Sequence, residues 1–173
     1  MEEPRSGQPV TIRMFHDYSD VTLWLDDPVG YEDSCVSAEL ATDLKRWEQA
    51  FYDSTNEDFE WLTPQSASAH TAQGNVLAQR VADEVGPGFE IEFSTYEPGV
   101  SARIFRAVGP AQNADAARAF SELAGAWQRE QVELERLREE TQEQGGQWFA
   151  YAPGSGDMFV GGDDEAGTGL QGV

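Results

Sequence analysis

Residues 89–108 read FEIEFSTYEPGVSARIFRAV, and this stretch decides the expected fold. Apolar and acidic side chains alternate over residues 89–93, which is typical of a half-buried β-strand. The turn signal Tyr96-Glu97-Pro98-Gly99 then separates this strand from a second one expected over 101–108. The stretch therefore predicts a β-hairpin.

A second hairpin is expected near the N-terminus. Apolar side chains occupy alternate positions in residues 10–16 and again in residues 21–25. Between them lies Asp17-Tyr18-Ser19-Asp20, which is rich in side chains that hydrogen-bond their own backbone in turns. The two segments are therefore expected to pair as antiparallel neighbours.

Three helices are predicted between and after the hairpins. The first spans 37–54, since Ser37 can cap it and its apolar side chains are spaced four, three and four residues apart. The second spans 66–85 and ends at Gly86-Pro87-Gly88, because proline cannot continue a helix. The third is long, about 113–142. The stripe of the first helix consists of Leu40, Leu44, Trp47 and Phe51.

The order of these elements indicates an α+β fold. We predict a mainly antiparallel four-stranded sheet of two hairpins, packed against two or three helices. Residues 1–8 are expected to be a flexible N-terminus, and 9–144 a single domain. Residues 145–173 form a Gly-rich acidic tail, which could carry a short hairpin over 147–160 and end in disorder.

The charge of the chain restricts its partners. It has 32 acidic and 11 basic residues, for a formal net charge of −21. Such an excess repels phosphate, which argues against direct binding to nucleic acid or to anionic membranes, and it attracts basic proteins. The polar N-terminus has no secretory signal and no apolar run is long enough to span a membrane, so a cytoplasmic location is expected.

No sequence motif assigns a catalytic, cofactor-binding or metal-binding residue. Cys35 is the single cysteine, which rules out an internal disulfide and a cysteine-based zinc site. Phosphate-binding glycine motifs and the signatures of zinc proteases, kinases and hydrolases are absent. The acidic loop at 26–33 lacks the spacing of an EF-hand. We therefore expect no cofactor.

The leading hypothesis is a protein-interaction module of the immunity or inhibitor type, which binds a basic partner through an acidic surface. Trp24 falls on the polar face of its strand, next to the acidic loop, and an aromatic side chain rimmed by carboxylates is typical of a binding hot spot. The long helix at 113–142 offers a surface for a homodimer. The candidate partner-binding residues are Trp24, Asp26, Asp27, Tyr31, Glu32 and Asp33.

Two alternatives remain open. One is an enzyme whose site is assembled from scattered side chains, with His16, Asp17, Asp20 and Cys35 as the first candidates. The other is an acidic mimic of nucleic acid, which would need carboxylates gathered on one face. The carboxylates that partly meet this need are Glu39, Asp43, Glu48, Asp53, Glu57 and Asp58.

Residues 17–91 resemble a group of uncharacterised small acidic proteins from actinobacteria. The resemblance rests on Asp17-Tyr18, on Leu23-Trp24 and on the acidic loop that follows. It also includes the apolar stripe of the first helix and the segment Glu84–Ile91, where the second helix ends and a strand begins. It implies no activity, cofactor or site residue.

Overall fold

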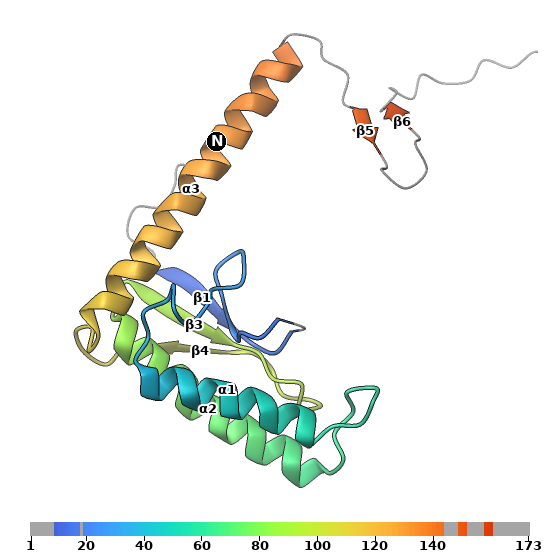
Figure 1. The fold of residues 1–173 in the computed structure, drawn as a ribbon, viewed down its shortest axis with the longest axis vertical. Helices are drawn as coiled ribbons and strands as arrows, with labels where there is room; N and C mark the ends of the chain where they lie inside the picture. The colour runs from blue at the N-terminus through green and yellow to red at the C-terminus, as the bar shows by residue number, and fades with distance from the viewer. Residues whose placement is uncertain (1–8, 18, 144–148, 152–157, 161–173) are drawn as a thin grey trace, which may run out of the picture. The chain divides into compact units, whose positions relative to one another are not determined.

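The computed structural model describes residues 9–17, 19–143, 149–151 and 158–160 (Figure 1). The chain divides into two compact units, Met1–Trp127 and Gln128–Val173, which are described separately. The flexibility expected for 1–8 and the disorder expected at the end of the tail both concern residues outside the described ones.

The first unit contains a four-stranded mixed sheet with the order β2-β1-β3-β4. β1 pairs with β2, and β3 with β4, in antiparallel directions, whereas the central strands β1 and β3 are parallel. The expectation of a mainly antiparallel sheet is therefore wrong, because the sheet is mixed and its two central strands are parallel. The strands are β1 Val10–Met14, β2 Leu23–Trp24, β3 Phe89–Phe93 and β4 Arg103–Arg106.

The parallel pair follows from the connection between β2 and β3. Two helices lie between them in sequence, and such a long crossover lets a strand enter the sheet parallel to its neighbour. Ile12 and Ile91 are register partners, and both are fully buried. Side-chain alternation predicted which residues face the core, but it is the same for either strand direction.

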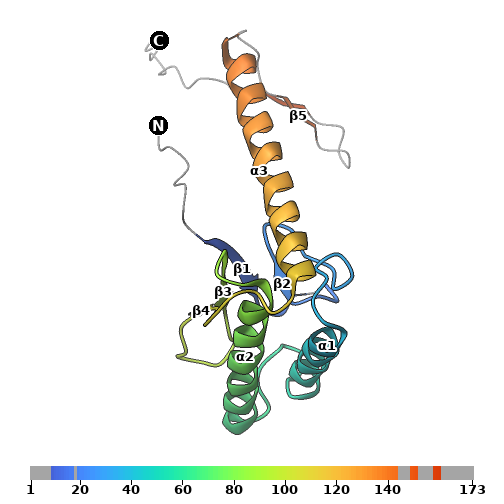
Figure 2. The same ribbon diagram turned by 90° about the vertical axis from the view of Figure 1, so that its left-hand side faces the viewer.

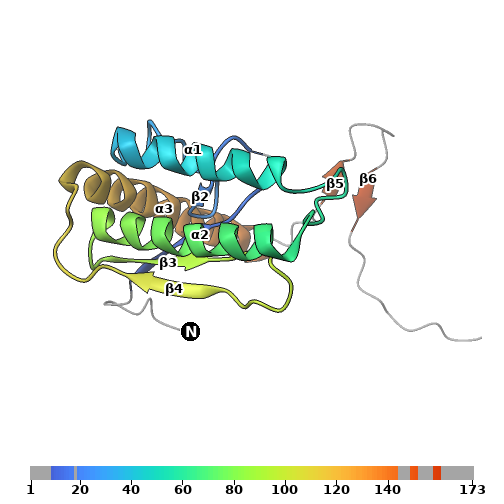
Figure 3. The ribbon, with the colours of Figure 1, turned by 90° about the horizontal axis from the view of Figure 1, so that it is seen from below.

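One face of the sheet is covered by the helices α1, Ala38–Asp53, and α2, Pro64–Val85. They lie side by side against it, as Figures 2 and 3 show. Both predicted helices are confirmed, with N-caps at Ser37 and Thr63, so α2 starts two residues earlier than expected. The predicted stripe of α1 is buried against α2 and the sheet, and it consists of Leu40, Leu44, Trp47 and Phe51.

Glu84 connects the ends of three helices. Its carboxylate accepts hydrogen bonds from the backbone N–H of Ser37 at 2.8 Å and from the Ser37 hydroxyl, at the start of α1. It also accepts one from Asn113 Nδ2 at 3.1 Å, at the start of α3. The next turn passes through Gly86 at φ +83°, where a Cβ would lie 2.8 Å from that of Ala111. One carboxylate near the end of α2 therefore holds the starts of α1 and α3 beside it.

The long helix α3 spans Ala114–Glu143, close to its predicted bounds. Its first turns belong to the first unit, where Ala116 and Phe120 are buried and the ring of Phe120 lies 6.0 Å from that of Phe89. The second unit contains a short antiparallel pair, β5 Phe149–Tyr151 and β6 Met158–Val160, within the range expected for a hairpin. None of the helices in the described ranges combines the length and hydropathy needed to cross a membrane.

Packing between α2 and the sheet gives the first prediction. A Cβ added at Gly74 would lie 2.8 Å from Trp47 Cζ2 and would overlap the ring of Phe93. Gly74→Ala should therefore lower the free energy of unfolding by about 1–3 kcal/mol, despite the higher helix propensity of alanine. Urea denaturation measures this change.

Gly88→Ala is the matched control, because a Cβ at Gly88 meets no atom within 4 Å. Its unfolding free energy should stay within about 0.5 kcal/mol of the wild-type value. Equal stability of the two variants would show that α2 does not pack this closely on Trp47 and Phe93.

Candidate functional site

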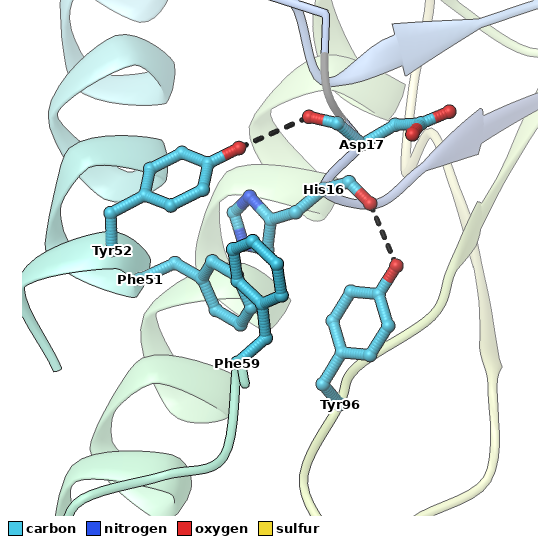
Figure 4. Close-up of a pocket in the computed structure, with 6 residues that line it drawn as sticks. All are labelled: His16, Asp17, Phe51, Tyr52, Phe59 and Tyr96. Atoms are coloured by element: carbon cyan, nitrogen blue, oxygen red, sulfur yellow. Dashed lines mark hydrogen bonds between the residues drawn. The ribbon is translucent and has the colours of Figure 1, made fainter. Parts of the chain in front are cut away.

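A pocket of about 130 Å³ opens at the C-terminal end of β1 (Figure 4). We call it the His16 pocket. Three stretches that are distant in sequence meet there: the residues after β1, the last turn of α1 with the α1–α2 loop that follows it, and the β3–β4 connection. Its lining consists of His16, Asp17, Phe51, Tyr52, Phe59 and Tyr96.

The base of the pocket is held by a reciprocal pair of hydrogen bonds between α1 and α2. Trp47 Nε1 donates to the carbonyl oxygen of His70 at 3.0 Å. His70 Nε2 lies 3.1 Å from the carbonyl oxygen of Trp47 and donates to it, since a carbonyl can only accept. The two rings are stacked, with centroids 4.6 Å apart. Burial lowers the pKa of His70 to about 4, so its ring is neutral near pH 7.

His16 forms the floor of the pocket and is only 3% exposed. Its ring stacks on Phe51 with centroids 4.6 Å apart and lies 4.1 Å from the ring of Trp47. Within the described part of the chain, neither ring nitrogen has a hydrogen-bond partner. Burial, and then the nearby His70, lower the pKa of His16 to about 3. The ring is therefore neutral, and one of its nitrogens is an unused acceptor.

Two tyrosines form the walls and are oriented by the backbone that follows β1. The Tyr52 hydroxyl donates to the carbonyl oxygen of Asp17 at 3.1 Å, and the Tyr96 hydroxyl donates to that of His16 at 2.8 Å. Figure 4 shows the ring of His16 between them. Tyr52 is 39% exposed and Tyr96 52% exposed. Their hydroxyls therefore fix the rings, and large parts of both side chains still face solvent.

Phe59 completes the wall from the α1–α2 loop. Its φ of +59° is unusual for a bulky residue and is energetically costly. The side chain of Asn56 stabilises the turn by accepting from the N–H groups of Asp58 at 3.0 Å and Glu60 at 2.8 Å. Trp61 anchors the loop by donating from Nε1 to the carbonyl oxygen of Tyr96 at 3.0 Å. As a result, the ring of Phe59 remains 42% exposed beside the pocket.

Acidic side chains lie around the pocket. Glu48 is buried, and burial together with the charge of Asp20 raises its pKa to about 7. The pKa of Tyr52 is also raised, by burial and then by the charges of Glu48, Asp17 and Asp20. No lysine or arginine lines the described pocket. The site therefore combines aromatic surface with carboxylates.

The predicted partner-binding residues lie elsewhere and are only partly exposed. Trp24 is half-buried and stacks on Phe15 at 5.2 Å, and Asp26 lies 3.6 Å from Arg13. Tyr31 is buried, with its hydroxyl 3.0 Å from Thr22 Oγ1, so it supports the loop from inside. The exposed carboxylates of this loop are Asp26, Asp27, Glu32 and Asp33.

The residues proposed for an enzyme site are only partly brought together. His16 and Asp17 both line the pocket, and the charge of Asp20 acts on Glu48 nearby. Cys35 is not among the lining residues: its Sγ lies 3.6 Å from the carbonyl oxygen of Glu32, and its own carbonyl accepts from Asn113. In the described ranges, no group of three His, Cys, Asp or Glu side chains could hold a metal ion.

The aromatic walls were missed by sequence reasoning. Tyr52 and Phe59 come from one stretch and Tyr96 from a distant one, and no spacing in the sequence relates them. One signal was available, since the segment from Phe59 to Trp61 places two large aromatic residues in a loop that should be polar. Such residues require either a packing partner or a function.

The neutral, buried state of His16 predicts an acid-dependent loss of stability. Its pKa is about 3 in the folded chain, below the usual value of 6.5, so its contribution to stability is complete above pH 6.5 and is lost as the pH falls toward 3. Phenylalanine can keep the ring stacking but cannot titrate. Between about pH 6 and pH 4, the wild type should therefore lose about 1.4 kcal/mol per pH unit more than His16→Phe in denaturant unfolding.

Glu48→Gln is the control, because Glu48 is expected to change stability with pH in the opposite direction. The pKa of Glu48 is raised to about 7 from 4.5, so its ionisation destabilises the fold as the pH rises between these values. Glu48→Gln should therefore gain stability relative to the wild type over that range. Parallel stability curves for the wild type and both variants would contradict the burial of these two side chains.

Comparison with known proteins identifies the family. The model of the Serratia CdiI immunity protein-like family matches residues 10–96, which include all six lining residues of the His16 pocket. No curated protein and no solved structure is significantly similar to the chain. The match supports a family assignment over the segment 17–91, but not the actinobacterial group that this segment resembles. Since it spans half of the chain, the chain belongs to the Serratia CdiI immunity protein-like family.

Proposed function

We propose that this chain is an immunity-type protein that binds a toxin with a basic surface and thereby neutralises it. The family match is the observation that carries this proposal, because an immunity protein acts on a protein partner. The net charge of −21 supports a basic partner, since opposite charges accelerate encounter and favour the correct orientation.

The distribution of ion pairs supports the same proposal. Several arginines of the first unit are already paired within the chain: Arg13 with Asp26, Arg80 with Asp43, and Arg106 with Glu90. Lys45 lies over the ring of Tyr31. These basic side chains therefore already have partners within the chain. The acidic residues outnumber them, and their excess negative charge can attract a partner.

We place the main contact at the His16 pocket. Tyr52 and Phe59 are exposed aromatic side chains next to carboxylates, and such side chains often dominate the binding energy of protein interfaces. Glu57 and Asp58 precede Phe59 and are exposed on the same loop. The surface therefore combines aromatic anchors with a charged rim, as a specific interface does.

The acidic loop at 26–33 remains a second predicted surface, with its four exposed carboxylates. A homodimer through the helix at 113–142 also remains a prediction. Neither is needed for the contact at the His16 pocket.

Co-expression with a toxin tests the proposed function. The full chain is expressed with candidate toxin domains encoded by neighbouring genes, and growth and binding are measured. We expect growth to be restored by one of these pairs, with an association rate constant that falls by at least about tenfold between low and physiological ionic strength. Toxicity that is unchanged by the chain, with no binding at low salt, would contradict the proposal.

Two matched variants locate the surface by removing four carboxylates each. One carries D17N, D20N, E57Q and D58N near the pocket, and the other carries D26N, D27N, E32Q and D33N in the acidic loop. The pocket variant should slow association more, because its charges surround the proposed contact. A larger effect of the loop variant would move the contact to the loop, and no effect of either would contradict charge-guided binding.

A further inference from the structure

We propose that the His16 pocket receives a cationic side chain, lysine or arginine, from the partner protein. This inference rests on the proposed function and deepens it, since it names the group that the partner inserts. Four features of the pocket support it: its aromatic walls, its charge, its floor and its size.

The walls are aromatic on several sides. The ring of Phe59 lies 6.4 Å from that of Phe51 and 6.3 Å from that of Tyr52, and the ring of Tyr96 lies 5.5 Å from that of Phe51. The face of an aromatic ring carries partial negative charge and attracts a cation placed within about 6 Å. Several rings around one small space therefore favour a cation over a neutral side chain.

The charge around the pocket is negative, as is the partial charge on the faces of the aromatic rings. Asp17 lines it, and the charge of Asp20 acts on Tyr52 in its wall. The C-terminal end of α1 carries the partial negative charge of the helix dipole, and its last turn has no basic residue to offset it. A cation from a partner would neutralise this charge, whereas an anion would be repelled.

The floor contains a hydrogen-bond acceptor that has no partner within the described residues. His16 is almost completely buried, and neither of its ring nitrogens is paired within the described residues. A buried polar atom without a partner is costly, so a group that donates a hydrogen bond to it would be stabilising. An ammonium or guanidinium group has only donors, so it matches the acceptor nitrogen of the neutral imidazole. That nitrogen has almost no exposed surface, so the rim side chains must move for the group to reach it.

The size of the pocket limits the occupant to a single side chain. Pockets for cofactors and drug-sized ligands measure about 300–1,000 Å³, well above the 130 Å³ found here. Phe59 and Tyr52 are both partly exposed at the rim, where the aliphatic part of a long side chain would contact them.

A titration with capped amino acids tests the inference without any toxin. The full chain is titrated with N-acetyl-lysine methylamide or N-acetyl-arginine methylamide, and with the norleucine analogue, which has a similar length but no charge. The ring signals of His16 and Tyr52 are followed by NMR. We expect saturable shifts from a cationic probe at millimolar concentration and much smaller shifts from norleucine.

Variants then assign the effect to the walls and to the charge. Phe59→Leu keeps an apolar side chain but removes the aromatic face, and it should weaken binding of the cationic probe about fivefold. Asp17→Asn should also weaken it, whereas Asp33→Asn, which removes an exposed carboxylate outside the pocket lining, should not.

Three outcomes would overturn the inference: equal shifts from norleucine, no shift from either cationic probe, or equal effects of Asp17→Asn and Asp33→Asn. Failure of the proposed function is measured separately, as a lack of protection against the toxin. A chain that protects the cell but does not bind the cationic probes would keep its immunity role and lose only the assignment of this pocket.

Discussion

The reciprocal hydrogen bonds between Trp47 and His70 are the interaction on which the site depends. Each side chain donates to the carbonyl oxygen of the other, so α1 and α2 are held at one separation and one rotation. The ring of Trp47 also supports His16 at 4.1 Å and approaches Gly74 so closely that no side chain fits there. The floor of the His16 pocket is therefore part of the core, and its position is set by the packing of the two helices.

The rim of the pocket is built differently from its floor. Tyr52 and Tyr96 are fixed by hydrogen bonds to backbone carbonyls, and Phe59 is held by a turn with a costly positive φ. Backbone strain of this kind is common at functional sites, because the surrounding structure must compensate for it. A rigid floor beneath exposed aromatic rings suits a protein that recognises one partner, since little order has to be created on binding.

Much of the fold could be predicted from the sequence. Helix α1 could be predicted from its apolar stripe, Leu40, Leu44 and Trp47, and from its cap, Ser37. Helix periodicity and capping depend only on residues close together in the sequence. The parallel pairing of β1 and β3 could not be predicted, since alternation does not encode strand direction. His16 was recognised as a candidate because it ends a strand. The aromatic walls were not, because they combine Tyr52 and Phe59 with Tyr96 from a distant segment. Tyr31 was predicted to lie on the partner-binding surface, but it is buried. Its contact with Thr22 forms only in the folded chain, and no pattern in the sequence indicates it.

Hydrogen–deuterium exchange of the chain, alone and with the toxin that we propose as its partner, tests the role of the His16 pocket. We expect protection on binding to concentrate in the three segments that contribute the lining residues: residues 15–17, 51–61 and 94–97. Protection confined to the acidic loop at 26–33, or to the face of the sheet opposite the two helices, would show that the toxin binds elsewhere and would contradict the account.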